Sequence, residues 1–344
     1  MFARLTKASA PILLGALAVA LVFFVPLSAG TTWTSVAEIF GGLSALTVVG
    51  LGAVWIGGLT CNSVALAASM PGLTVRRALT LSLTGSAVAN VLPMGGAGGV
   101  GLNYVMTRRW GFSRTKFATY TATTNVLDVA SKLLVAAAAS LILLLEGRIH
   151  LFHRGVAPVL EFFLVVPCLA VLLFSRPTGT AVGRALDSVV RVGSRLIRRP
   201  ISSRLAERIP QIAHLTRTAI RRRWAHMTFG SLSYAGLQII LLWGCLRAAG
   251  LHLDLTTLIC AFAADRVLTM VPLTPGGVGI VEGGMAAVLS ALGFDAGPAV
   301  AGVLIYRGFT YLAEIPVGGA LAVLWTVFHR RQDPQLAPAQ GTGR

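Results

Sequence analysis

Charged and amide side chains occur at helical spacing in the otherwise apolar stretch 117–145. Asp128 and Lys132 are four residues apart, and Asn125 precedes them by one turn, so a helix would place all three on one face. Ionisable residues inside an apolar segment are costly, which makes them candidates for function. Two interpretations remain open: the pair neutralises itself locally, or this face contacts a substrate.

A second apolar stretch, 298–328, carries a comparable set of polar residues. Arg307 and Glu314 are seven residues apart and share a helix face, with Tyr306 and Tyr311 close by. We expect the polar faces of the two stretches to form one seam, along which a polar substrate would pass.

The segment between these stretches, 256–293, contains three further ionisable residues. Asp265 and Arg266 precede its Pro/Gly-rich middle, and Glu282 follows it. An arginine–carboxylate pair would hold the segment closed, and direct contact with substrate is the alternative.

Enzyme and metal chemistry have no matching motif. The histidines form no HExxH pattern, no GxSxG motif is present, and Cys61, Cys168, Cys245 and Cys260 form no CxxC pair. The run from Gly96 to Gly101 fits G-x-G-x-x-G, but it lies between apolar segments and not in a βαβ unit. We therefore expect no enzymatic activity, no metal and no cofactor.

Composition indicates an all-α polytopic membrane protein. Of the 344 residues, 12% are charged and 55% are hydrophobic. A membrane-spanning helix needs about 20 mostly apolar residues. Six stretches qualify: 11–28, 43–66, 117–145, 156–174, 226–248 and 298–328.

The net charge of +17 is concentrated beside these spans, mainly in the predicted loop 175–225. Basic residues flanking spans are typical of cytoplasmic loops. The pattern predicts that both termini are cytoplasmic, and it favours contact with anionic lipid over nucleic acid.

Counting crossings from these basic clusters predicts two re-entrant hairpins. Stretches 79–106 and 256–293 would each begin and end on one side of the membrane. The chain then divides into a first repeat, 1–150, an inverted second repeat, 151–331, and a short polar tail, 332–344. The expected turn residues are Pro93, Gly98, Gly99, Gly101, Pro272, Pro275, Gly276, Gly277 and Gly279.

Two observations bear on that prediction. Gly98-Gly99-Val100-Gly101 recurs as Gly276-Gly277-Val278-Gly279 at the corresponding position of the second repeat. Inverted repeats with broken helices are typical of transporters. The alternative is that these glycines only allow close helix packing.

Several motifs resemble the flippase-like transmembrane domain of lysylphosphatidylglycerol synthases and their stand-alone relatives. They include the segment from Pro272 to Glu282, the tyrosine and arginine at 306–307 with Tyr311, and the first-half stretch from Asn90 to Pro93 with Asp128. The resemblance covers nearly the whole chain.

The resemblance implies transbilayer movement of a lipid, anionic or phosphate-bearing, in the bacterial cytoplasmic membrane. The alternative is a non-transporting accessory subunit of a lipid glycosyltransferase or lipid synthase, which makes a lipid-synthesising enzyme a possible partner. Lysyl transfer is not expected, because only the tail 332–344 follows the last span.

Overall fold

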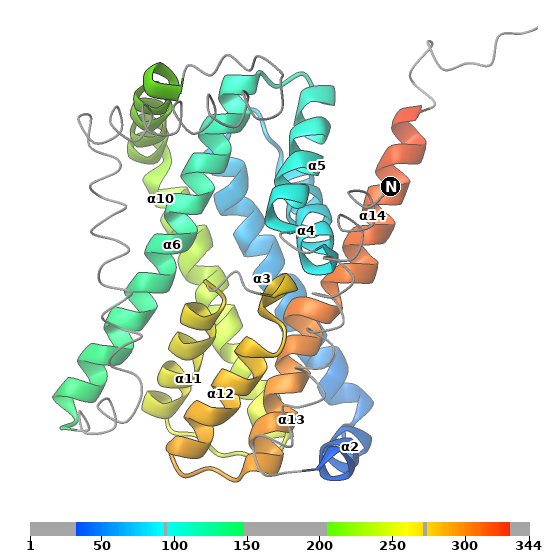
Figure 1. The fold of residues 1–344 in the computed structure, drawn as a ribbon, viewed down its shortest axis with the longest axis vertical. Coiled ribbons are helices and arrows are strands. Elements are labelled where there is room, and N and C mark those ends of the chain that lie inside the picture. Colours follow the sequence, from blue (N-terminus) through cyan, green and yellow to red (C-terminus); the bar gives the residue numbers. More distant parts are fainter. Residues whose placement is uncertain (1–31, 93–94, 148–204, 271–273, 331–344) are drawn as a thin grey trace, which may run out of the picture.

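The computed structural model describes residues 32–92, 95–147, 205–270 and 274–330, which are helical and contain no strand (Figure 1). The all-α prediction is confirmed for this part of the chain. The helices are α2 (Trp33–Gly41), α3 (Ala45–Ser69), α4 (Val75–Val91), α5 (Gly95–Arg109), α6 (Arg114–Leu145), α10 (Leu205–Ala248), α11 (Leu255–Leu268), α12 (Ile280–Ala291), α13 (Ala296–Arg307) and α14 (Glu314–Arg330), with a 3-10 turn η1 (Pro275–Gly277) and a π turn η2 (Gly308–Leu312).

Four helical segments are long and apolar enough to cross a membrane: Ala45–Ser69, Arg114–Leu145, Gln211–Ala248 and Ala296–Phe328. They overlap the expected spans 43–66, 117–145, 226–248 and 298–328. The expected spans 11–28 and 156–174 lie outside the described residues. Large apolar side chains such as Leu46, Leu134 and Phe229 are exposed on these helices, as lipid-facing residues would be.

Side-chain caps define where several of the helices begin. Ser44 accepts a hydrogen bond from the Thr47 amide at the start of α3, and Thr74 caps α4 through the Arg77 amide. Ser113 caps α6 in the same way. These hydroxyls satisfy backbone donors that lack a partner in the first turn of a helix.

Two helical hairpins extend from opposite ends of the molecule, and their helices meet near its middle (Figure 1). The first consists of α4 and α5, and the second of α11, η1 and α12. The hairpins overlap the stretches 79–106 and 256–293 that were predicted to be re-entrant, although α4 begins at Val75 and α5 ends at Arg109. α11 packs against α6 of the first half, while α14 of the second half packs against α4.

Three glycines expected in the first turn lie instead within a helix. Gly98, Gly99 and Gly101 belong to α5, which begins at Gly95. The reason is packing: a Cβ atom on Gly99 would lie 2.5 Å from the Gly85 carbonyl oxygen of α4. Glycine here allows the two helices of the hairpin to touch, as the packing alternative predicted.

Each hairpin has its own hydrophobic core. The cluster that joins the first hairpin to α6 includes Leu81, Met106 and Phe117. The larger cluster, which joins the second hairpin to α3, α10 and α13, includes Phe262 and Met285.

Part of the predicted basic loop 175–225 is helical. Residues 205–225 belong to the long helix α10, and only Arg223 departs from helical geometry, with φ −130° and ψ 19°. The loop was predicted from its charge, yet arginine, alanine and leucine are good helix formers and tolerate a solvated helix. Residues 175–204 lie outside the described part of the chain.

Candidate functional site

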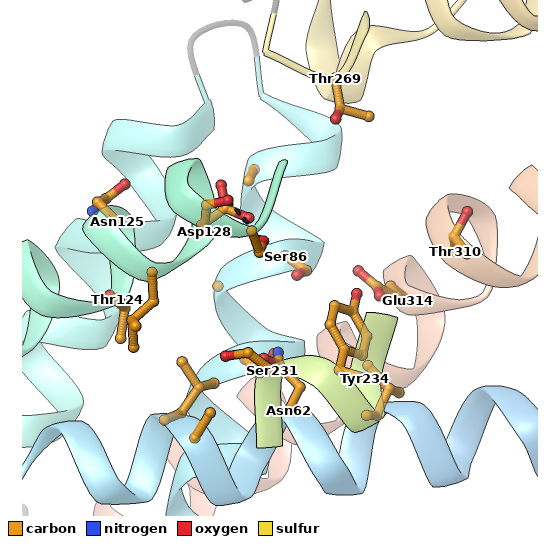
Figure 2. Close-up of a pocket in the computed structure, with 18 of the residues that line it drawn as sticks. Asn62, Ser86, Thr124, Asn125, Asp128, Ser231, Tyr234, Thr269, Thr310 and Glu314 are labelled. Carbon is orange, nitrogen blue, oxygen red and sulfur yellow. Dashed lines mark hydrogen bonds between the residues drawn. The ribbon is translucent and has the colours of Figure 1, made fainter. Parts of the chain in front are cut away.

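A polar cavity of about 640 Å³ lies between the two halves of the chain. Its walls come from α3, α4, α5 and α6 of the first half and from α10, α11, α13, η2 and α14 of the second half. In Figure 2, Asp128, Asn125 and Ser86 lie across this space from Tyr234, Ser231 and Glu314. The cavity therefore joins the two polar faces that the sequence predicts.

Most of the predicted path residues line this cavity. They are Asn125, Asp128, Lys132, Arg266, Arg307, Tyr311 and Glu314. Asp265, Glu282 and Tyr306 do not line it, but each contacts an arginine that does. The sequence analysis missed other polar lining residues: Asn62, Ser82, Ser86, Asn103, Thr124, Ser131, Ser231 and Gln238. These residues are polar but uncharged. Inside an apolar helix, an uncharged polar residue is a weaker signal of function than an ionisable one.

Asp128 and Lys132 form an ion pair on α6, with the Lys132 Nζ 2.8 Å from the Asp128 Oδ2. The Lys132 side chain is 13% exposed, whereas that of Asp128 is 55% exposed. Asn125 donates a hydrogen bond of 2.7 Å to the Thr121 carbonyl of its own helix. The pair is therefore neutralised locally, and it also faces the cavity, so both interpretations of these residues are compatible with the structure.

Arg266 is the centre of a buried network on the opposite wall. Its Nε lies 2.8 Å from the Oδ2 of Asp265, and its Nη2 is 3.2 Å from the Tyr306 hydroxyl. The Tyr306 hydroxyl donates to Gln238, whose amide in turn donates to Tyr234 over 2.7 Å. The Asp265 Oδ1 has no hydrogen-bond partner in the described part of the chain.

Arg307 stabilises the turn of the second hairpin. Its Nε lies 2.7 Å from the Glu282 Oε1, and its Nη2 donates over 2.7 Å to the Gly276 carbonyl. The other Glu282 oxygen accepts the Gly279 amide over 2.6 Å. Gly276 and Gly279 have φ values of +60° and +82°, a region that favours glycine. The sequence analysis considered a closing pair among Asp265, Arg266 and Glu282. In the structure Arg266 pairs with its neighbour Asp265, and Glu282 pairs with Arg307, which lies outside that set.

Asn90 of the first hairpin contacts Tyr311 of η2, the turn between α13 and α14. The Tyr311 hydroxyl donates to the Asn90 carbonyl over 2.8 Å, and the Asn90 amide donates to the Tyr311 carbonyl over 3.3 Å. η1 also packs against α4. Tyr311 lies in the π turn η2, and π turns are frequent at functional sites. The predicted turn residues Pro93 and Pro272 lie outside the described residues, whereas Pro275, Gly276 and Gly277 form η1.

The charges around the cavity are unevenly paired. Lys132, Arg266 and Arg307 each have a carboxylate partner. Glu314 is only 9% exposed and lies within salt-bridge distance of no lysine or arginine among the described residues. Nowhere in the described ranges do three or more His, Cys, Asp or Glu side chains gather as metal ligands would.

The long apolar helices agree with one comparison. The family model of the lysylphosphatidylglycerol synthase transmembrane region matches residues 9–318. No curated protein and no solved structure matches the chain. The match covers most of the 344 residues, including both hairpins and all the residues that line the cavity. The chain is therefore a membrane protein that belongs to the family of lysylphosphatidylglycerol synthase transmembrane regions.

Proposed function

We propose that the protein moves a phosphate-bearing lipid across the bacterial cytoplasmic membrane, with the headgroup passing through the polar cavity. The cavity itself carries the argument. It opens between apolar helices whose outer faces suit lipid, and it is lined by hydroxyl, amide and charged groups from both halves. A polar headgroup would cross there while the acyl chains remain in the bilayer.

The helix lengths support re-entrant hairpins. At 1.5 Å per residue, α4 with 17 residues is about 26 Å long, and α12 with 12 residues is about 18 Å long. The hydrocarbon core is about 30 Å thick. Neither helix is long enough to cross it alone, and the helices of the two hairpins meet near the middle of the molecule (Figure 1).

The packing of the hairpins supports an inverted repeat. The first helix of each hairpin packs against the spanning segment that follows the hairpin of the other half. α11 packs against α6, and α4 packs against α14, the second part of the segment Ala296–Phe328. α3 and α10, which precede the two hairpins, pack against each other. Exchanging the two halves leaves this arrangement unchanged, as in transporters that alternate their access between two sides.

The cavity chemistry favours a phosphate-bearing headgroup. Lys132, Arg266 and Arg307 place cationic groups on its walls. α5 begins at the turn of the first hairpin, and Gly96 and Gly99 of its first turns line the cavity. The start of a helix carries a partial positive charge that favours anions.

The orientation follows from the arginines. Arg76, Arg77, Arg108 and Arg109 lie on α4 and α5 at the end of the molecule where α10 begins (Figure 1). This end would face the cytoplasm under the positive-inside rule.

The test is lipid movement in liposomes that contain the purified protein and a fluorescent phosphatidylglycerol, phosphatidylethanolamine or phosphatidylcholine. The wild type should accelerate the exchange of at least one of these lipids between leaflets. Glu314→Gln should slow that exchange by about tenfold or more, because it removes the cavity carboxylate that has no lysine or arginine partner among the described residues. Glu38→Gln makes the same change at an exposed position on α2 and should retain the wild-type rate.

Two results would contradict the proposal. If Glu314→Gln and Glu38→Gln both match the wild type, the cavity is not the route. If the wild type moves none of the three phospholipids, an accessory subunit of a lipid-synthesising enzyme becomes the better account.

A further inference from the structure

A second hollow, of about 500 Å³, lies on the other face of α3. α3 lines the cavity with Ala65, Leu66 and Ser69, and lines this groove with Val64, Ala67 and Ala68. The remaining walls are Leu73 and Val75 at the start of α4, and Arg222, Arg223 and His226 of α10. No residue of the groove lines the cavity.

The basic side of the groove coincides with an irregularity in α10. Arg223 has φ −130° and ψ 19°, so the helix changes course at this residue. Arg222 and His226 lie on either side of it, and all three side chains are exposed. None of the three has a hydrogen bond or ion pair with another residue of the described ranges.

This lack of partners distinguishes the groove from the cavity. Lys132, Arg266 and Arg307 are each paired with a carboxylate of the chain. No acidic residue lines the groove among the residues that the structure describes. Arg222 and Arg223 therefore remain available to an anionic ligand.

The rest of the groove narrows the choice of ligand. Val75 is the first residue of α4, so the positive end of that helix dipole adds to the positive charge of the arginines. The opposite wall consists of Val64, Ala67, Ala68 and Leu73, which are apolar and mostly small. A ligand with an anionic head and an apolar tail matches both walls, whereas a free anion matches only the basic one.

We propose that this groove binds the headgroup of an anionic phospholipid from the adjoining leaflet, with its phosphate at Arg222 and Arg223 and its glycerol and upper acyl chains along α3. The site is separate from the cavity and does not depend on transport. A bound lipid would hold α10 against the first turn of α4, where the first hairpin begins.

The test uses the full-length protein in neutral detergent, titrated with dioleoylphosphatidylglycerol, dioleoylphosphatidylcholine or inorganic phosphate, with thermal unfolding as the readout of binding. Phosphatidylglycerol should raise the unfolding midpoint of the wild type. The double variant Arg222→Gln/Arg223→Gln should bind it roughly thirtyfold more weakly, as expected for the loss of two cations near a membrane surface.

Two controls separate the groove from general basicity. Arg221→Gln removes the same charge from the preceding exposed residue of α10, which does not line the groove, and it should retain wild-type affinity. Arg222→Lys/Arg223→Lys keeps the charge and should bind within a few-fold of the wild type. For the wild type itself, sodium chloride should weaken binding, because exposed charges are screened.

Several results would overturn the proposal. One is equal affinity of the double glutamine variant and Arg221→Gln for phosphatidylglycerol. A second is stabilisation by phosphatidylcholine equal to that by phosphatidylglycerol. A third is stabilisation by inorganic phosphate equal to that by the lipid, which would identify a free-anion site. Wild-type binding that is unaffected by salt would overturn the proposal even if the variants do not fold.

Discussion

Arg307 connects more parts of the candidate site than any other side chain described above. It pairs with Glu282, donates to the Gly276 carbonyl and stacks over the Tyr311 ring at 4.9 Å from its centroid. Through Tyr311 it is linked to Asn90 on the first hairpin. One buried cation thus holds the turn of one hairpin and supports its contact with the other.

Removing the partner of this cation should destabilise the protein strongly. Glu282→Gln leaves the Arg307 guanidinium buried without a counter-charge, because the two side chains are only 4% and 8% exposed. Breaking a buried pair in this way costs about 3–5 kcal/mol. Unfolding by a denaturing detergent should show a loss of that size in the free energy of unfolding.

The exposed residue Glu38 again supplies the matched control, since Glu38→Gln should change stability by no more than about 0.5 kcal/mol. If the two variants were equally stable, Glu282 would not be holding the turn.

Residue types were easier to predict from the sequence than their partners. The ionisable path residues stood out because charge is rare inside apolar helices, and most of them do line the cavity. Their pairing was not predictable. Glu282 and Arg307 lie 25 positions apart, and Asn90 and Tyr311 lie 221 apart, so only the packed helices bring them together.

At the scale of elements, the first hairpin depends on the close approach of α4 and α5. A Cβ atom on Gly99 would lie 2.5 Å from the Gly85 carbonyl oxygen, so the backbones are in contact there. Another close contact joins α4 to α14, where a Cβ atom on Gly318 would lie 2.0 Å from the Leu83 carbonyl oxygen. Glycines therefore allow α4 to pack closely against both α5 and α14.

Alanine substitutions at Gly99 and at Gly101, two residues apart in α5, should have opposite effects on the free energy of unfolding. Gly99→Ala forces α4 and α5 apart and should lower the free energy of unfolding by about 1–3 kcal/mol. Gly101→Ala has nothing within 4 Å of its Cβ and should raise it by about 0.5–1 kcal/mol through helix propensity. The same detergent titration measures both. Loss of stability at both positions, or at neither, would contradict this packing.

Element boundaries were predicted where the bilayer constrains them. Long apolar helices are necessary to cross the hydrocarbon core, so hydropathy located the described spans well. Charge alone misled the prediction for residues 205–225, which are helical. The π turn at Gly308–Leu312 has no signal in hydropathy, because it changes only the hydrogen-bond register.

At the scale of the whole molecule, the two halves would insert in opposite directions. This proposal predicts the accessibility of single cysteines in a cysteine-free background. Arg76→Cys and Thr115→Cys flank the first hairpin and should both react from the cytoplasmic side. His252→Cys and Asp295→Cys flank the second hairpin and should both react from the outside. All four positions are exposed.

The side from which each cysteine reacts is measured with an impermeant thiol reagent applied to oriented membranes. If Arg76→Cys and Thr115→Cys reacted from opposite sides, α4 and α5 would together cross the bilayer, and the inverted repeat would be wrong. The sequence suggested this arrangement only through basic clusters and a four-residue Gly-rich repeat. The meeting of the two hairpins near the middle of the molecule emerges only from the folded chain (Figure 1).

The most direct test of the central claim is to block the cavity chemically. Ser131 lines the cavity, whereas Ser140 lies on the same helix outside its lining, and both hydroxyls donate to backbone carbonyls of α6. Ser131→Cys and Ser140→Cys would be introduced singly into the cysteine-free protein, labelled to completion with a bulky maleimide and assayed for lipid exchange in liposomes. We predict that labelling abolishes exchange for Ser131→Cys and leaves it unchanged for Ser140→Cys. Full exchange through a completely labelled Ser131→Cys protein would contradict a headgroup route through the cavity.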